Sequence, residues 1–161
     1  MMKLDSVAST VAICAALASS GAALAQSYGP PITLDQARKA YAAAEGEAVR
    51  MNKGAVTIAI LDSGCNLVLL QKGDNTQLAS PMVAQEKAWA ACAYRRPTKV
   101  LQDALAKGGD GLRYLQFHRM VAADGALPIV VDGKIIGAIG VSGLTGAEDG
   151  QIARAGAAAV K

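Results

Sequence analysis

Two pairs of apolar, β-branched runs, each joined by turn residues, constrain the fold of this chain most strongly. Asp132-Gly133 separates the runs of the second pair, and this dipeptide favours a two-residue hairpin turn. Asp62-Ser63-Gly64 separates the runs of the first pair, again with residues that favour turns. We therefore predict two β-hairpins, with strands over residues 56–61, 66–71, 127–131 and 134–141.

Helical signals lie before, between and after these hairpins. Thr33 is placed to cap a helix, and Gln36 three residues later completes a capping box. Pro81 follows Ser80 at the first position of another helix. Hairpins that alternate with helices predict an α/β (α+β) fold, in which a central antiparallel sheet of two hairpins is covered by helices. The helices are expected over residues 34–51, 80–96, 98–107 and 145–160, and residues 110–119 are ambiguous between a helical turn and a loop.

Residues 1–25 have the features of a cleavable secretory signal. Lys3 supplies a positive charge, residues 7–17 form a short run of small and mostly apolar residues, and Ala23-Leu24-Ala25 is an A-x-A cleavage site. The run is shorter than the roughly 20 apolar residues of a membrane span. We expect a domain of residues 26–161, exported to the periplasm or the medium. A lipidated Cys14 and an N-terminal core helix are the alternatives.

Charge and cysteine content narrow the possible functions. The formal net charge is +3, and no basic block is combined with aromatic residues, which argues against a nucleic-acid surface. Cys65 and Cys92 lie in the expected domain, and export permits a disulfide between them. The sequence does not give their geometry, and two separate buried thiols are the favoured arrangement. A Cys/His zinc site has little support, because there is one histidine and no C-x-x-C pair.

The chain carries no recognised catalytic motif. Ser142 lies in Gly140-Val141-Ser142-Gly143, which is not the G-x-S-x-G pattern of a nucleophile elbow. The glycines from Gly137 to Gly140 are not followed by the helix of a dinucleotide-binding loop. The acidic residues are scattered over expected loops, where turn and cap roles are the default. The sequence therefore assigns no catalytic residue and leaves open whether the protein is an enzyme.

His118 is the side chain with the clearest capacity to bind a ligand. A neutral imidazole binds iron or zinc. It lies among Arg113, Tyr114, Phe117 and Arg119, which could contact a haem macrocycle through their rings and pair with its propionates through their guanidiniums. Haem is thus the suspected cofactor, with His118 as its metal ligand. The alternative is a surface loop packed by Phe117.

Beyond these residues, the chain from Ile32 to Lys161 resembles the haem-binding-protein-S / glycolate-utilisation-protein-G family, also called the haem-degrading domain family. The resemblance rests on several blocks that occur in the same order, and the stretch from Gly125 to Gly143 is the most diagnostic. The other blocks are Leu34-x-x-Ala37, the hairpin from Val56 to Gly64, Ser80-x-x-x-Ala84-x-x-Lys87-Ala88, Thr98-x-x-Leu101, Asp149 and Ala153.

The resemblance implies an α-β-α sandwich of the profilin-like type and a symmetric homo-oligomer, with an octamer possible. Some members of the family bind haem or release its iron, and some act as extracytoplasmic redox partners. Lys87 matches a family lysine and becomes a further cofactor-binding candidate. Two features differ from the family pattern: Ala126-Leu127 replaces the usual Gly-Gly before Pro-Ile, and the single histidine leaves no counterpart for multi-histidine iron sites.

These observations favour an exported protein that binds haem, for sequestration of haem or iron or for a redox-linked role. One alternative is a small-molecule enzyme or accessory protein of organic-acid metabolism, with a pocket near Lys87, Asp62 and Ser142. The other is a structural partner of an exported dehydrogenase. Besides haem or another small molecule, the expected partner is a second copy of the chain, with no nucleic acid and no membrane span.

Overall fold

The two predicted hairpins form one four-stranded antiparallel sheet in the order β2-β1-β4-β3. The computed structural model describes residues 26–161, so the predicted signal sequence lies outside the described residues. Asp132 and Gly133 both have positive φ angles, of 49° and 73°, as the predicted two-residue turn requires. The elements are α1 (Leu34–Arg50), β1 (Thr57–Asp62), β2 (Leu67–Lys72), α2 (Ser80–Ala93), α3 (Thr98–Ala106), the 3₁₀ helix η1 (Gly109–Gln116), β3 (Ala126–Val131), β4 (Lys134–Ser142) and α4 (Gly146–Ala158).

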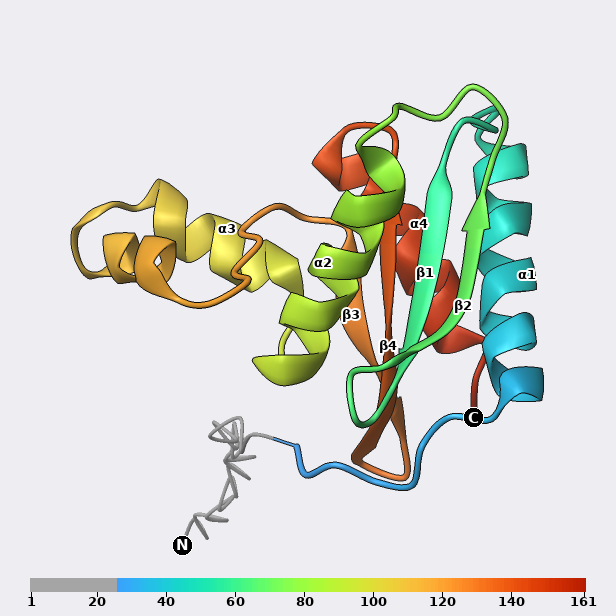
Figure 1. Ribbon diagram of the computed structural model, residues 1–161, viewed down its shortest axis with the longest axis horizontal. Helices are drawn as coiled ribbons and strands as arrows, with labels where there is room; N and C mark the ends of the chain where they lie inside the picture. The colour runs from blue at the N-terminus through green and yellow to red at the C-terminus, as the bar shows by residue number, and fades with distance from the viewer. Residues whose placement is uncertain (1–25) are drawn as a thin grey trace, which may run out of the picture.

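Helices cover both faces of this sheet, as Figure 1 shows. α2 lies on one face, against β1, β3 and β4, whereas α1 and α4 pack together on the other face. α3 and η1 contact each other and project to one side of the sandwich. The predicted α+β architecture of an antiparallel sheet between helices is therefore confirmed. The ambiguous segment after α3 is mostly the 3₁₀ helix η1.

Small residues bring α2 unusually close to the sheet. The helix presents Ser80, Ala84, Ala88 and Ala91, all fully buried, to the sheet. A Cβ atom on Gly140 of β4 would lie only 2.2 Å from the Ala84 carbonyl oxygen. The helix backbone thus rests on the strand backbone, and no space remains between them.

The opposite face carries the main apolar core. α1 places a stripe of buried alanines against it, and its start has the predicted capping box: the Gln36 N–H donates to the Thr33 hydroxyl at 3.2 Å. No aromatic side chain is among the buried core residues of the part of the chain that the structure describes. The largest fully buried side chains of this core are Ile58, Ile60, Ile129, Ile139 and Ile152.

The expectation of two separate thiols is wrong, because Cys65 and Cys92 form a disulfide. Cys65 lies in the β1–β2 turn with a φ of 62°. The spacing of the cysteines in the sequence does not show that Cys65 adopts this left-handed conformation. Their Cα atoms are 5.8 Å apart, within the usual range for a disulfide. The bond fastens the β1–β2 turn to the last turn of α2.

Candidate functional site

The segment between α3 and β3 brings the chain's only histidine to the C-terminal end of α2. His118 lies beside Trp89, with ring centroids 5.8 Å apart in an edge-to-face arrangement. The Tyr94 hydroxyl, just beyond the end of α2, donates a hydrogen bond of 2.7 Å to the His118 carbonyl oxygen. These contacts hold the backbone at His118 in place, while the residue itself is exposed to solvent.

Two further aromatic rings complete the surface around His118. Phe117 stacks on Tyr94 with centroids 6.1 Å apart, and it meets Tyr114 edge-on at 5.6 Å. The only Trp, the only Phe and the only His of the chain are here, with two of its four Tyr. We call Trp89, Tyr94, Tyr114, Phe117 and His118 the aromatic cluster.

Two arginines flank the aromatic cluster in different ways. The Arg119 guanidinium lies 4.4 Å above the Trp89 ring and donates two hydrogen bonds to Glu86, at 2.8 and 2.9 Å. The hydrogen bond to Glu86 raises the pKa of Arg119 above its ordinary value. Arg113 is exposed, and its guanidinium lies 5.6 Å from the centre of the Tyr114 ring. Arg119 is therefore committed to Glu86, whereas Arg113 faces solvent beside the cluster.

The structure brings together five of the six predicted site residues: Arg113, Tyr114, Phe117, His118 and Arg119. The sequence prediction missed Trp89 and Tyr94, because it used the α2 segment only for its start at Ser80-Pro81 and for the family block that contains Lys87. The signal was available, since Trp89 lies two residues after Lys87 and Tyr94 lies close to the predicted end of the helix. Because the chain has so few aromatic residues, two of them near one end of a helix indicate an aromatic surface there.

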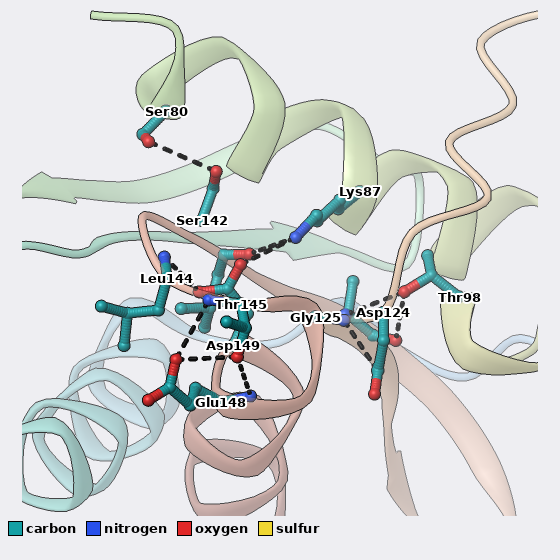
Figure 2. A network of polar contacts seen from close by, with 12 residues as sticks. Ser80, Lys87, Thr98, Asp124, Gly125, Ser142, Leu144, Thr145, Glu148 and Asp149 are labelled. Carbon is teal, nitrogen blue, oxygen red and sulfur yellow. Dashed lines mark hydrogen bonds and ion pairs between the residues drawn. The ribbon is translucent and has the colours of Figure 1, made fainter. Parts of the chain in front are cut away.

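The sixth predicted residue, Lys87, lies apart from the aromatic cluster. Its side chain is buried, and its ammonium donates to the Asp149 carboxylate at 2.9 Å and to the Val141 carbonyl oxygen at 3.1 Å. Burial raises the pKa of the Asp149 carboxyl above its usual value, although the Lys87 ammonium opposes this shift. The pair joins α2 to the end of β4 and to α4, as Figure 2 shows. The prediction that Lys87 contacts the same ligand as His118 has no geometric support.

The polar network around this pair is closely packed. A Cβ atom on Gly125 would lie 2.7 Å from the Lys87 ammonium nitrogen, so the ammonium fills the space above that glycine. Ser142 donates a hydrogen bond of 3.3 Å to the Ser80 hydroxyl, also buried (Figure 2). The Thr57 hydroxyl is the one buried side-chain polar atom without a partner among residues 26–161. The network connects α2 to β4 and to α4.

Lys87, Asp62 and Ser142 do not form the pocket suggested for a small-molecule enzyme. Ser142 pairs with Thr57 at the start of β1, whereas Asp62 lies at its other end. The Asp62 carboxylate accepts the N–H groups of Gly64 and Asn66 and so shapes the β1–β2 turn. Asp62 therefore lies apart from Lys87 and Ser142, which belong to the buried polar network near the start of β1.

A groove of about 550 Å³ lies elsewhere, between α1 and the end of β2. Tyr41, Glu45, Val49, Gln71 and Lys72 are among its lining residues. The Tyr41 hydroxyl donates to Glu45, and burial together with this bond raises the pKa of Tyr41 to about 12. The groove contains none of the predicted site residues.

Within residues 26–161, no group of three or more His, Cys, Asp or Glu side chains is placed to hold a metal ion. In the same part of the chain, no helix is long and apolar enough to cross a membrane. The aromatic cluster has a single imidazole, so it is the candidate site for a metal ion that is already coordinated within a cofactor.

Comparison with known proteins points to one family. The family model described as "Haem degrading protein HbpS-like" matches residues 32–158. Protein GlcG of Escherichia coli K12 is 38% identical over 111 residues, which is 69% of this chain and 81% of GlcG. An uncharacterised 15.0 kDa protein of Citrobacter freundii is 37% identical over 120 residues, which is 73% of this chain and 84% of that protein.

Solved structures agree with this assignment. A double mutant of Streptomyces reticuli HbpS has a TM-score of 0.74 at 29% identity, covering 97% of this chain and 99% of its own. A PduOC:haem complex has a TM-score of 0.72 at 25% identity, covering 81% of this chain and 96% of its own. The relatives therefore share the whole of the sandwich.

Proposed function

Because this chain belongs to the HbpS-like family of haem-degrading proteins, we propose that it binds haem at the aromatic cluster, with His118 as an axial ligand. The observation that carries this proposal is the position of the only imidazole, which is exposed and surrounded by most of the chain's aromatic rings. The PduOC:haem complex supports the proposal, because it is a protein of similar fold in complex with haem.

The residues present fit the chemistry of haem. The His118 imidazole supplies a nitrogen donor, the commonest protein ligand to haem iron in globins and peroxidases. Phe117 and Tyr114 offer ring surfaces for the macrocycle. Arg113, exposed beside Tyr114, is the better partner for a propionate, because Arg119 is already paired with Glu86. Bound haem would supply iron-centred redox chemistry, and the protein would orient it and shield one of its faces.

The test is a haem titration of the purified protein and of His118→Ala. We expect the protein to shift the Soret band and to quench the emission of Trp89, which is the only tryptophan and lies next to His118. The His118→Ala variant should bind about tenfold more weakly or worse, because a lost axial bond removes more than 1.4 kcal/mol, the equivalent of about tenfold in affinity.

Gln116→Ala is the matched control, since Gln116 is exposed and only two residues from His118. It should bind haem as the parent does. Absence of a Soret shift with the parent would refute haem binding. An unchanged spectrum and affinity in His118→Ala would refute the role of His118 while leaving haem binding intact.

We also propose that the protein is exported and cleaved after Ala25. The Cys65–Cys92 disulfide supports this proposal, because disulfides persist mainly in oxidising compartments. Mass spectrometry of the periplasmic or culture fraction should find Gln26 as the N-terminus. Ala25→Leu should block this cleavage, because the position requires a small residue. A protein that retains residues 1–25 in the mature form would contradict the proposal.

We further propose a homo-oligomer in which β2 pairs with β2 of a second copy. β2 is an edge strand whose Leu67 and Leu70 are 48% and 37% exposed, and it contains no proline. The other edge strand, β3, contains Pro128, a residue that discourages pairing at an edge. The one charged residue of β2, Lys72, stands at the end of the strand, so most of this exposed apolar edge is open to pairing with another chain.

Light scattering at micromolar concentration should therefore give a mass above that of one chain. Leu70→Lys is expected to lower this mass, because a charge at the edge opposes strand pairing. Leu78→Lys is the control, since Leu78 is 98% exposed but lies outside the strand, and it should leave the mass unchanged. A monomeric parent, or an unchanged mass in Leu70→Lys, would refute this interface.

A further inference from the structure

The Cys65–Cys92 disulfide reaches the same end of α2 that carries the aromatic cluster. The two cysteines are separated by 27 positions in the sequence. Cys65 belongs to the β1–β2 turn, and Cys92 is the penultimate residue of α2. The bond is thus a covalent link between the sheet and the last turn of this helix.

Both side chains that hold His118 are attached to this last turn. Trp89 precedes Cys92 by three positions and contacts the His118 ring, whereas Tyr94 follows it by two and binds the His118 carbonyl oxygen. The Tyr28 hydroxyl also donates to the Cys92 carbonyl oxygen, at 2.9 Å. A shift of this turn would therefore move both contacts of His118 together.

The two sulfurs differ in their surroundings. Cys92 is fully buried among Ala91, Ala126 and Ala138, whereas Cys65 is half-buried. Cys65 also holds a positive φ of 62°, which L-residues other than glycine seldom adopt. The Asp62 carboxylate accepts the Gly64 and Asn66 N–H groups, and neither of these hydrogen bonds involves a sulfur atom. Opening the bond should therefore release Cys65 and the end of α2 without unfolding the turn.

From this arrangement we propose that the disulfide controls the haem site: the oxidised protein holds the aromatic cluster in its binding form, and reduction weakens haem binding. This inference rests on the proposed haem function. Opening the bond requires a two-electron reductant, and the reductant we propose is a dithiol. One thiolate attacks the Cys65 sulfur, the S–S bond breaks and Cys92 leaves as a thiolate. The second thiol then attacks the mixed disulfide and releases Cys65, so that the dithiol becomes a disulfide and the protein gains two electrons and two protons.

The experiment compares the oxidised parent with Cys65→Ser/Cys92→Ala in the absence of any reductant, so that no thiol touches the haem iron. Alanine suits position 92 because its surroundings are apolar. We expect haem to bind the variant about tenfold more weakly, measured at the Soret band. Without haem, the Trp89 emission of the variant should differ from that of the oxidised parent, because the turn that carries Trp89 has lost its link to the sheet.

The two readouts separate the possible failures. If the parent does not bind haem, the proposed function fails, while the Trp89 emission still tests the link between disulfide and cluster. If the parent binds haem and the variant binds it equally well, the control by the disulfide is refuted, whatever the emission does. If the variant does not fold, the parent reduced by dithiothreitol and freed of reagent without air replaces it, with the same expectations.

Discussion

Replacing Lys87 with methionine is expected to lower the free energy of unfolding by about 3–5 kcal/mol at neutral pH. The substitution keeps most of the side-chain volume but removes the ammonium that lies 2.9 Å from the Asp149 carboxylate. Asp149 would then be a buried carboxylate whose remaining hydrogen-bond donor is the Leu144 N–H. Urea denaturation followed by far-UV circular dichroism measures the effect.

The loss in Lys87→Met should shrink in acid. Burial already raises the pKa of Asp149, and removing Lys87 removes the charge that opposes this rise. The native variant would therefore bind a proton at Asp149 at a pH where the unfolded chain does not. Its free energy of unfolding should rise, relative to the parent, as the pH falls through the raised native pKa of Asp149 toward the lower pKa of the unfolded chain.

Lys99→Met is the control for this prediction, because the Lys99–Asp103 pair is about half exposed and exposed pairs contribute about 0–1 kcal/mol. A Lys87→Met variant as stable as Lys99→Met would show that the buried pair contributes little. The double replacement Lys87→Met/Asp149→Leu should recover much of the loss, because no buried charge remains without a partner.

The second large effect is expected at Gly140, where alanine should cost on the order of 3 kcal/mol or more. The new Cβ atom would lie 2.2 Å from the Ala84 carbonyl oxygen and 2.7 Å from the Ala88 nitrogen. Both are backbone atoms of α2, so relief requires the whole helix to move away from the sheet. Thermal and urea denaturation of Gly140→Ala should both show the loss.

Gly46→Ala is a control that is expected to change the free energy of unfolding in the opposite direction. Gly46 lies within α1, and a Cβ atom there would meet nothing within 4 Å. Alanine at such a helix position should stabilise the protein by about 0.5–1 kcal/mol. If Gly140→Ala were as stable as the parent, the close approach of α2 to β4 would be refuted.

Most of the fold could be predicted because local signals and long-range packing agree. The Asp132-Gly133 turn and the Thr33–Gln36 capping box each appear at the predicted residues. The disulfide could not be predicted, because it depends on the left-handed backbone at Cys65 and on the docking of α2 against the β1–β2 turn.

The candidate site was predictable only in its local part. Arg113 to Arg119 are close in sequence, so their composition alone indicated a surface that could hold a macrocycle. Trp89 and Tyr94 join them only because the segment after α3 turns back along α2. Lys87 matched a family position, but a pattern does not show whether a lysine points to a ligand or into a buried ion pair. Its burial against Asp149 decides this in favour of the ion pair.

Because α2 lies in close contact with the sheet, substitutions on its outer surface and substitutions beneath it are expected to have different effects. The residues between α2 and the sheet are mainly alanines and glycines in close contact, whereas, under the proposed function, a ligand as large as haem is recognised on the outer surface of α2 and the segment beside it. Substitutions there can alter what is bound while the sandwich stays intact. Substitutions of the alanines and glycines under α2 alter mainly stability, whereas Cys92, which also lies there, links the sheet to the turn that carries the surface. New specificities can thus arise on this fold without first weakening it.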